Sequence, residues 1–169
     1  MLEVRLDGCR AADSSLIHCM LASAEGGAVD LSRARVDNSN FVKAKLPHLH
    51  APALQGQNTS WYGCDLTGAL LDGASLQAAN FMEAQLIQVS LMHTQLKKAQ
   101  FAGAQLINAN LAGSQLFSAN LFAVDVTGGD FRGAILHSAN VEGAKLDHCD
   151  FSSANVTSSL LDKSSDVRH

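Results

Sequence analysis

The hydrophobic positions of this chain recur every five residues from one end to the other. Steps of five from Met1 to Leu161 visit 33 positions, and 29 of them hold Leu, Phe, Val, Met or Trp. A second column, two residues before each large residue, is mostly small. A period of five fits neither the 3.6-residue period of an α-helix nor the two-residue period of a β-strand. It indicates a repeat architecture, which has to be settled before any short motif is interpreted.

The two columns predict short extended segments joined by turns. Residues two apart in an extended segment point to the same side. The large and the small residue of each repeat therefore point inward, and the other three face outward. A chain that turns after each short piece closes into coils, and coils stack through backbone hydrogen bonds. This arrangement is a β-solenoid, in which each unit buries its core by stacking on its neighbours.

The recurring triplets resemble the Ala-(Asp/Asn)-Leu-X-X motif of the pentapeptide repeat family. Examples are Cys64-Asp65-Leu66, Ala79-Asn80-Phe81, Ala109-Asn110-Leu111, Ala119-Asn120-Leu121, Ala139-Asn140-Val141, Cys149-Asp150-Phe151 and Ala154-Asn155-Val156. The resemblance implies an all-β fold, a right-handed quadrilateral β-helix with four repeats per coil. We expect about eight coils over residues 1–161, a rod of ~40 Å at the spacing of paired strands. Residues 162–169 are expected to form a C-terminal cap or tail, with a short helix over residues 158–163.

The aromatic residues agree with four repeats per coil. Residues twenty apart should stack on one face, and the large aromatic residues fall into two such columns on opposite sides. The expected structural core contains Phe41, Trp61, Phe81 and Phe101 in one column, and Phe131 and Phe151 in the other. An amide ladder is also expected, because Asn40, Asn80, Asn120 and Asn140 share a column with Gln100.

Two stretches depart from the pattern, near residues 24–28 and 47–60. Gly26 replaces a large residue in the first. In the second, Leu49 and Leu54 occupy the small column, while Ala51 and Gly56 occupy the large one. Either the exchanged volumes fill the core locally, or the stretch bulges outward as a loop. Both prolines of the chain lie here, which favours an interrupted ladder.

Composition and charge exclude several classes of protein. The net charge is −4, with ten acids and six bases after residue 60, far from the basic footprint of a nucleic-acid-binding protein. No apolar run approaches the length of a membrane span. The charged start MLEVRLDGCR is unlike a signal peptide. The expected protein is soluble and cytoplasmic, of a kind found in bacteria, with neither membrane nor direct nucleic-acid binding.

Catalytic and metal-binding motifs are absent from the sequence, so we expect no enzyme activity, cofactor or metal. The four cysteines, Cys9, Cys19, Cys64 and Cys149, all occupy the small column and are expected to be packing thiols. His48 and His50 are close enough in sequence to reach one metal, but no third ligand accompanies them.

The outward positions contain an unusual column of apolar residues. Positions just after the large inward residue should be polar, yet several hold large hydrophobic side chains. A connected apolar surface on a soluble protein usually marks an interaction site. The candidate interface consists of Val42, Tyr62, Met82 and Phe122 on one face, Ile87 and Ile107 on the next, and Met92 one turn further on. Phe117 lies on another face and is interpreted as incidental.

Two functions are compatible with these features. The first is a non-enzymatic scaffold that binds a protein partner or a second copy of itself through the Val42 to Phe122 column. The second comes from one branch of the resembling family, the quinolone-resistance proteins, which mimic DNA and bind gyrase or topoisomerase IV. That function requires a rod with dense charge of one sign. Here Lys97, Lys98, Arg132 and Lys145 dilute the acids, so the scaffold is favoured.

Overall fold

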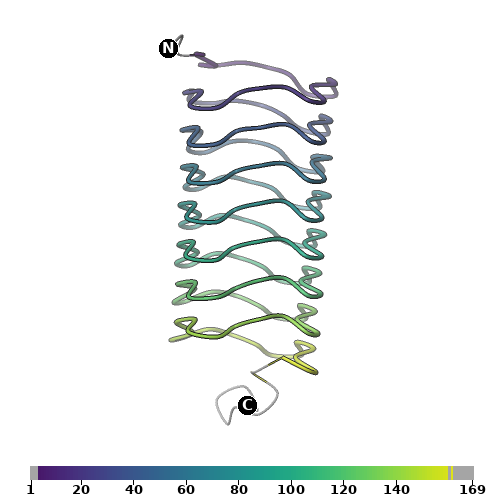
Figure 1. The fold of residues 1–169 in the computed structure, drawn as a ribbon, viewed down its shortest axis with the longest axis vertical. Helices are drawn as coiled ribbons and strands as arrows, with labels where there is room; N and C mark the ends of the chain where they lie inside the picture. The colour runs from purple at the N-terminus through teal and green to yellow at the C-terminus, as the bar shows by residue number, and fades with distance from the viewer. Residues whose placement is uncertain (1–3, 160, 162–169) are drawn as a thin grey trace.

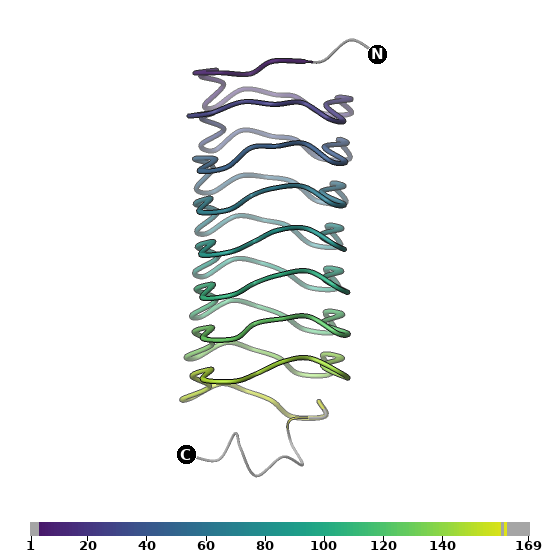
Figure 2. The same cartoon turned by 90° about the vertical axis from the view of Figure 1, so that its left-hand side faces the viewer.

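The chain folds into a four-sided rod of stacked coils. The computed structural model describes residues 4–159 and 161, and the first and the last of the described coils lie at opposite ends of the rod (Figures 1 and 2). Parallel β-bridges join every fifth residue to the residue twenty positions later, from Arg5–Glu25 to Ile135–Asn155. Each coil therefore holds twenty residues, and the 156 residues from 4 to 159 make just under eight coils. The prediction of a quadrilateral β-helix is confirmed.

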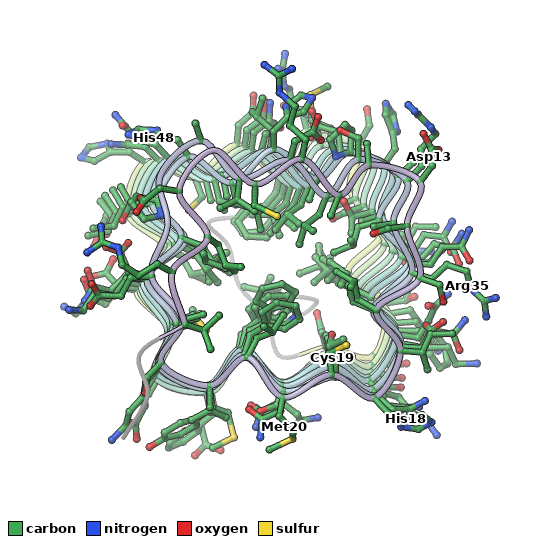
Figure 3. The ribbon with its side chains drawn as sticks, turned by 90° about the horizontal axis from the view of Figure 1, so that it is seen from above. Asp13, His18, Cys19, Met20, Arg35 and His48 are labelled. Carbon is green, nitrogen blue, oxygen red and sulfur yellow. The ribbon has the colours of Figure 1, made fainter. Side chains whose placement is uncertain are left out.

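The view along the axis in Figure 3 shows four sides around a centre into which one set of side chains points. Each side carries two outward columns of residues, and we name each side after one of its residues. The Val42 face carries residues 20 and 22 and their equivalents at intervals of twenty. The Ile87 face carries residues 25 and 27, the Met92 face residues 30 and 32, and the Phe117 face residues 35 and 37, with the same equivalents.

Every repeat has the same internal layout, which the segment Asp65 to Ala69 illustrates. Asp65 forms the β-bridge, Leu66 is the large inward residue, Thr67 and Gly68 make the turn, and Ala69 is the small inward residue. The regular structure consists of single bridge residues rather than longer strands, because a turn begins two residues after each bridge. Leu66 and Ala69 are fully buried.

Four of the five backbone N–H groups of a repeat donate to backbone carbonyls. Asp65, Leu66 and Gly68 donate to the neighbouring coils, and Ala69 donates across the turn to Leu66. The N–H of Thr67 is the exception, since it donates to the side chain of Asp65 instead, at 3.0 Å. The first turn residue of each repeat thus has an N–H that the ladder does not use.

The second turn residue always has a left-handed backbone. All 31 of these residues from Gly8 to Ser158, 9 glycines and 22 others, have φ between +52° and +73°. A turn with positive φ only at its third residue is of type II, which favours Gly or Asn there and accepts Pro before it. Left-handed residues other than glycine carry a cost of about 1–2 kcal/mol each. The stacking of neighbouring coils must outweigh this cost.

The Asp or Asn of the motif caps the turn that follows it. Among the described residues, eleven bridge positions hold Asp or Asn, and in all eleven the Oδ1 atom accepts the free N–H of the first turn residue at 2.9–3.2 Å. These residues are Asp30, Asn40, Asp65, Asn80, Asn110, Asn120, Asp125, Asp130, Asn140, Asp150 and Asn155. Short polar side chains of this kind commonly bond to the backbone two residues ahead. The Asp or Asn of the motif therefore supplies an acceptor for the one N–H of each repeat that the ladder leaves unused.

The interrupted ladder expected near residues 47–60 does not occur, and the change of pattern near residues 24–28 also leaves the ladder intact. Bridges continue through Glu25, Lys45, His50, Gln55 and Ser60 in phase. Pro47 and Pro52 both occupy the first turn position, where the missing N–H removes no ladder bond. The expectation was wrong because it assumed that the prolines occupy positions whose N–H takes part in the ladder, whereas the first turn position makes no ladder hydrogen bond.

The exchanged side-chain volumes fill the core locally. Leu49 and Leu54 in the small column are fully buried, as is Ala51 in the large column. A Cβ added at Gly56 would lie 3.1 Å from both Val36 and Leu76, so the neighbouring coils already occupy the space. The same holds at Gly26, where an added Cβ would lie 2.8 Å from the backbone of Leu6.

The aromatic side chains form two stacks along the rod axis. Phe41, Trp61, Phe81 and Phe101 are fully buried, with successive ring centroids 4.0, 6.3 and 5.1 Å apart and nearly parallel planes. Trp61 also needs a partner for its buried indole N–H, and Thr59 accepts it at 2.8 Å while donating to Gly56 O. In the opposite column Phe131 and Phe151 stack at 4.8 Å.

The two ends of the rod are less buried than its middle. Leu6, Leu16 and Leu21 in the first coil and Leu146 and Phe151 in the last are only partly covered. Leu161 is 4% exposed and packs on the last coil. The expected capping helix lies largely outside the described residues, as does the expected boundary of the tail. Within the described part of the chain, no helix has the length and hydrophobicity needed to cross a membrane.

Proline substitutions should separate the free turn position from the ladder. Ala102 occupies the first turn position, and its N–H makes no backbone hydrogen bond, so Ala102→Pro should leave the free energy of unfolding unchanged or raise it by about 0.5–1 kcal/mol. The backbone N–H of Gln105 donates to Ala84 O at 3.0 Å. Gln105→Pro removes this ladder bond and should lower the free energy of unfolding by about 3 kcal/mol or more. Urea unfolding of both variants measures the two effects. Equal losses of stability would contradict the assignment of the first turn position to a place outside the ladder.

Acid should weaken the Asp caps. The pKa values of Asp30 and Asp150 lie below 3.8, because the Ser side chain two residues later donates to each carboxylate. The side chains of Thr127 and Arg132 lower the pKa values of Asp125 and Asp130 in the same way. A depressed pKa in the folded state means that these carboxylates stabilise the fold above pH 3.8 and that this contribution is lost as the pH falls below it.

A variant with all four aspartates changed to Asn tests this loss. Asn caps the same turn elsewhere in the rod, but it does not titrate. Urea unfolding at about pH 7 and about pH 3 should therefore show a smaller acid-induced drop in stability for the variant than for the wild type. An identical drop in both proteins would show that other groups carry the acid sensitivity.

Candidate protein interface

The predicted apolar column forms one edge of the Val42 face. Val42, Tyr62, Met82 and Phe122 lie at intervals of twenty residues, or forty where Ala102 intervenes, each at the first turn position of its repeat. Phe122 is 45% exposed, while Val42, Tyr62 and Met82 are half-buried because they lie against neighbouring turns. The column is therefore continuous, but its most accessible apolar surface is at Phe122.

Polar atoms border the apolar column. Tyr62 Oη donates to Glu83 Oε2 at 2.6 Å, and this hydrogen bond raises the pKa of Tyr62. Beside it, Lys43, Lys45, Tyr62 and Glu83 line a shallow hollow of about 430 Å³ at the corner of the rod. The hydroxyl, ammonium and carboxylate groups around the hollow could orient a partner that covers the column.

The other predicted interface residues do not all join this column. Ile87 and Ile107 are half-buried and lie on the adjacent Ile87 face, around a corner from Met82. Met92 lies two corners away, on the face opposite the Val42 column. A flat partner that covers Phe122 cannot reach Met92 at the same time. The structure thus divides the predicted surface over three faces, with the Val42 column as its largest part.

The second column of the same face carries the amides. The ladder predicted there forms over three residues: Asn120 Nδ2 donates to Gln100 Oε1 at 3.2 Å, and Asn140 Nδ2 donates to Asn120 Oδ1 at 3.3 Å. Asn40 and Asn80 are separated by Ser60, and each caps its own turn, as Asn120 and Asn140 also do. Amide ladder and apolar column together give this face one polar and one apolar edge.

Sequence reasoning missed several exposed hydrophobic residues. Met20 is 71% exposed on the Val42 face (Figure 3), Leu70 is 42% exposed and Ile135 is 41% exposed. All three occupy a bridge position, where the motif favours a polar residue. This departure from the motif was a signal that could have identified them. Phe117, interpreted as incidental, is 38% exposed.

The histidines do not form a metal site. His48 lies at a corner of the rod (Figure 3), with its ring against Gly68 of the next coil. His50 lies on the Met92 face. Among the residues that the structure describes, no group of three or more His, Cys, Asp or Glu side chains is close enough to hold a metal ion.

The cysteines are free thiols that pack in the small column. Cys64 is fully buried and its Sγ lies 2.7 Å from Phe41 O. Burial raises the pKa of Cys64 to about 12, so this thiol is protonated and unreactive near neutral pH. Cys149 is half-buried and its pKa is also raised by burial. Cys9 and Cys19 lie at the less buried N-terminal end.

Much of the surface charge is already paired within the rod. Within residues 4–159, six of ten Lys and Arg side chains form ion pairs with Asp or Glu, for example Arg33 with Asp13 and Lys145 with Asp125. Several carboxylates also cap turns, as described above. The surface therefore alternates in sign instead of presenting dense negative charge.

Solved structures similar to this chain include pentapeptide repeat proteins and a fluoroquinolone resistance protein. HetL from the cyanobacterium Nostoc sp. strain PCC 7120, described as involved in heterocyst differentiation regulation, is 24% identical over 94% of this chain and 85% of its own, with a TM-score of 0.32. Rfr23 from the cyanobacterium Cyanothece 51142 is 22% identical over 89% and 90%, with a TM-score of 0.36. A comparison with curated proteins finds no match.

Full-length QnrB1, described as a plasmid-mediated fluoroquinolone resistance protein, matches with a higher TM-score. It is 15% identical over 90% of this chain and 91% of its own, with a TM-score of 0.51. This likeness concerns the fold alone.

The family model for pentapeptide repeats matches eight copies within residues 62–97, 84–121 and 114–152. These segments together cover residues 62–152, more than half of the chain. The period of five, the type II turn in every repeat and the Asx cap agree with the match. The chain belongs to the pentapeptide repeat family, whose fold is a right-handed quadrilateral β-helix.

Proposed function

We propose that this protein is a non-enzymatic scaffold that binds a protein partner, or a second copy of itself, through the Val42 face. The observation that carries the proposal is the unbroken column Val42, Tyr62, Met82, Ala102 and Phe122 at positions that face outward. At the spacing of paired strands the column is ~20 Å long. Contiguous exposed apolar surface on a protein of this size favours an interaction site over chance.

The rigidity of the rod supports this role. The middle coils bond to both neighbours through backbone N–H and C=O groups, so a partner on the flank cannot add a strand there. Recognition would depend on side chains held at a fixed spacing. Because the scaffold is already ordered, its side chains lose little conformational entropy on binding.

Gyrase binding by DNA mimicry is the alternative, and the charge distribution does not favour it. Carboxylates such as Asp125 and Asp130 are paired with Lys145 and Arg132 and cap turns, so they do not form a continuous row of free negative charge. The likeness to QnrB1 is one of fold. A DNA supercoiling assay with and without a quinolone decides this alternative. Inhibition of gyrase by micromolar concentrations of this protein, or protection of gyrase from the quinolone, would support gyrase binding and contradict the proposed scaffold function.

Charged substitutions in the column should abolish assembly. Met82→Asp combined with Phe122→Asp places two carboxylates in the apolar edge, so a complex that buries this edge should weaken by about tenfold or more per buried charge. Sedimentation velocity measures self-association, and affinity capture from a host extract followed by mass spectrometry measures partner binding. Loss of either complex is the expected result.

A matched variant controls for added charge. Ala12→Asp combined with Leu70→Asp adds the same charge at two exposed positions on the Met92 face, opposite the Val42 face. This variant should assemble as the wild type does, and thermal unfolding should be similar for all three proteins. If the column variant keeps both its oligomeric state and its captured proteins, the Val42 face is not the interface.

A further inference from the structure

The C-terminal half of the Phe117 face carries a stacked group of side chains that the Val42 column does not involve. Lys97, Phe117 and His137 lie in one outward column at intervals of twenty residues. Lys97 Nζ lies over the Phe117 ring, 5.5 Å from its centroid. The His137 ring stacks with Phe117 at 5.2 Å and 25°. His137 Nδ1 also lies 2.8 Å from Thr157 Oγ1, so the column is supported over four coils.

Ile135 extends this stack sideways. It occupies the second outward column of the same face and is 41% exposed, beside Phe117 at 38%. Its bridge position holds Ser75, Gln95 and Gln115 in the preceding coils, so the apolar side chain is not required by the ladder. The face thus presents an apolar site next to the ammonium group of Lys97.

The surface around the stack contains no carboxylate. Residues 93–98, 113–118, 133–138 and 153–158 form this face and its two corners in four successive coils, and they include no Asp or Glu, although the chain has 16. Lys97 and Lys98 make no ion pair with any residue that the structure describes, unlike Arg132 and Lys145 on other faces. Two unpaired ammonium groups therefore border an exposed apolar site on an acidic protein.

Two classes of anionic macromolecule could meet two ammonium groups, and the geometry separates them. Single-stranded nucleic acid binds by stacking bases on free aromatic faces and by many phosphate contacts. Here one face of the Phe117 ring is covered by Lys97 and the other by His137, and only two lysines are available. The exposed ring edge and Ile135 suit an aliphatic or aromatic side chain instead.

We infer that the C-terminal half of the Phe117 face, defined by Lys97, Lys98, Phe117, Ile135 and His137, binds an acidic protein segment. Carboxylates of the segment pair with Lys97 and Lys98, and an apolar side chain of the segment contacts Phe117 and Ile135. Charge complementarity with an otherwise acidic rod sets the orientation. This inference concerns a different face from the proposed scaffold surface and does not rest on it.

Fluorescence anisotropy with the full chain tests the inference. The probe is a fluorescein-labelled peptide of repeated Glu-Glu-Leu triplets, with a Gln-Gln-Leu peptide and an oligo-deoxythymidine of similar length as comparisons. We expect saturable binding of the acidic peptide that weakens as salt is added, because exposed charge pairs are screened. No saturable binding of the acidic peptide at low salt, equal binding of the Gln-Gln-Leu peptide, or preference for the oligonucleotide would each overturn the inference.

Charge-reversal variants locate the binding on this face. Lys97→Glu combined with Lys98→Glu should lower the affinity for the acidic peptide by about tenfold or more. A matched control variant combines Arg10→Glu with Ala12→Glu and Gln105→Glu, at exposed positions on the Met92 and Ile87 faces. It changes the net charge by the same amount and should lose much less affinity for the acidic peptide. Equal losses of affinity in the two variants would mean attraction by net charge alone and would overturn the site.

A second matched pair tests the apolar contact. Ile135→Ser should reduce the affinity several-fold, since Ser occupies the same column at Ser75 without disturbing the ladder. Leu70→Ser removes an equally exposed apolar side chain from a bridge position on the Met92 face and should have no effect. Thermal unfolding shows whether each variant is folded. An unchanged affinity in folded Ile135→Ser would contradict the apolar part of the site.

Discussion

The backbone hydrogen-bond ladder between coils is the interaction on which the rest of this structure depends. Three N–H groups of each repeat bond to neighbouring coils, and a fourth closes the turn. This leaves one N–H per repeat, at the first turn residue, and forces the second turn residue to positive φ. The identity of the side chains follows from these constraints: Asp or Asn where its oxygen can cap the free N–H, and proline where no N–H is needed.

Because the ladder satisfies the backbone on all four flanks, the surface can vary without loss of the fold. The rod tolerates Tyr62, Phe117, Phe122 and Leu70 at outward positions, since neither the ladder nor the core uses these side chains. Each outward column therefore acts as an independent row with a fixed spacing. A corner of the rod separates the two surfaces proposed above as binding sites, the Val42 face and the C-terminal half of the Phe117 face.

Two features of the interior could be predicted from the sequence together with their physical cause. The five-residue period determined which residues point inward, and the segregation of Phe41, Trp61, Phe81 and Phe101 from Phe131 and Phe151 indicated four sides. The interruption expected at Pro47 and Pro52 was wrong, because the sequence does not say which N–H of a repeat is unused. The candidate interface was predicted as a set of outward columns. Two corners of the coil lie between Met92 and the column of Val42 and Phe122, so these residues cannot belong to one flat surface.

The sequence by itself determined the repeat, the inward columns and the absence of catalytic motifs, because alternation and turn chemistry are local properties of the chain. Only the tertiary structure decided which outward side chains are accessible, since exposure depends on residues twenty positions away. It is the stacking of coils that half-buries Met82 and leaves Phe122 exposed. The same stacking brings Lys97 and His137 to the two sides of the Phe117 ring, forty residues apart in the chain.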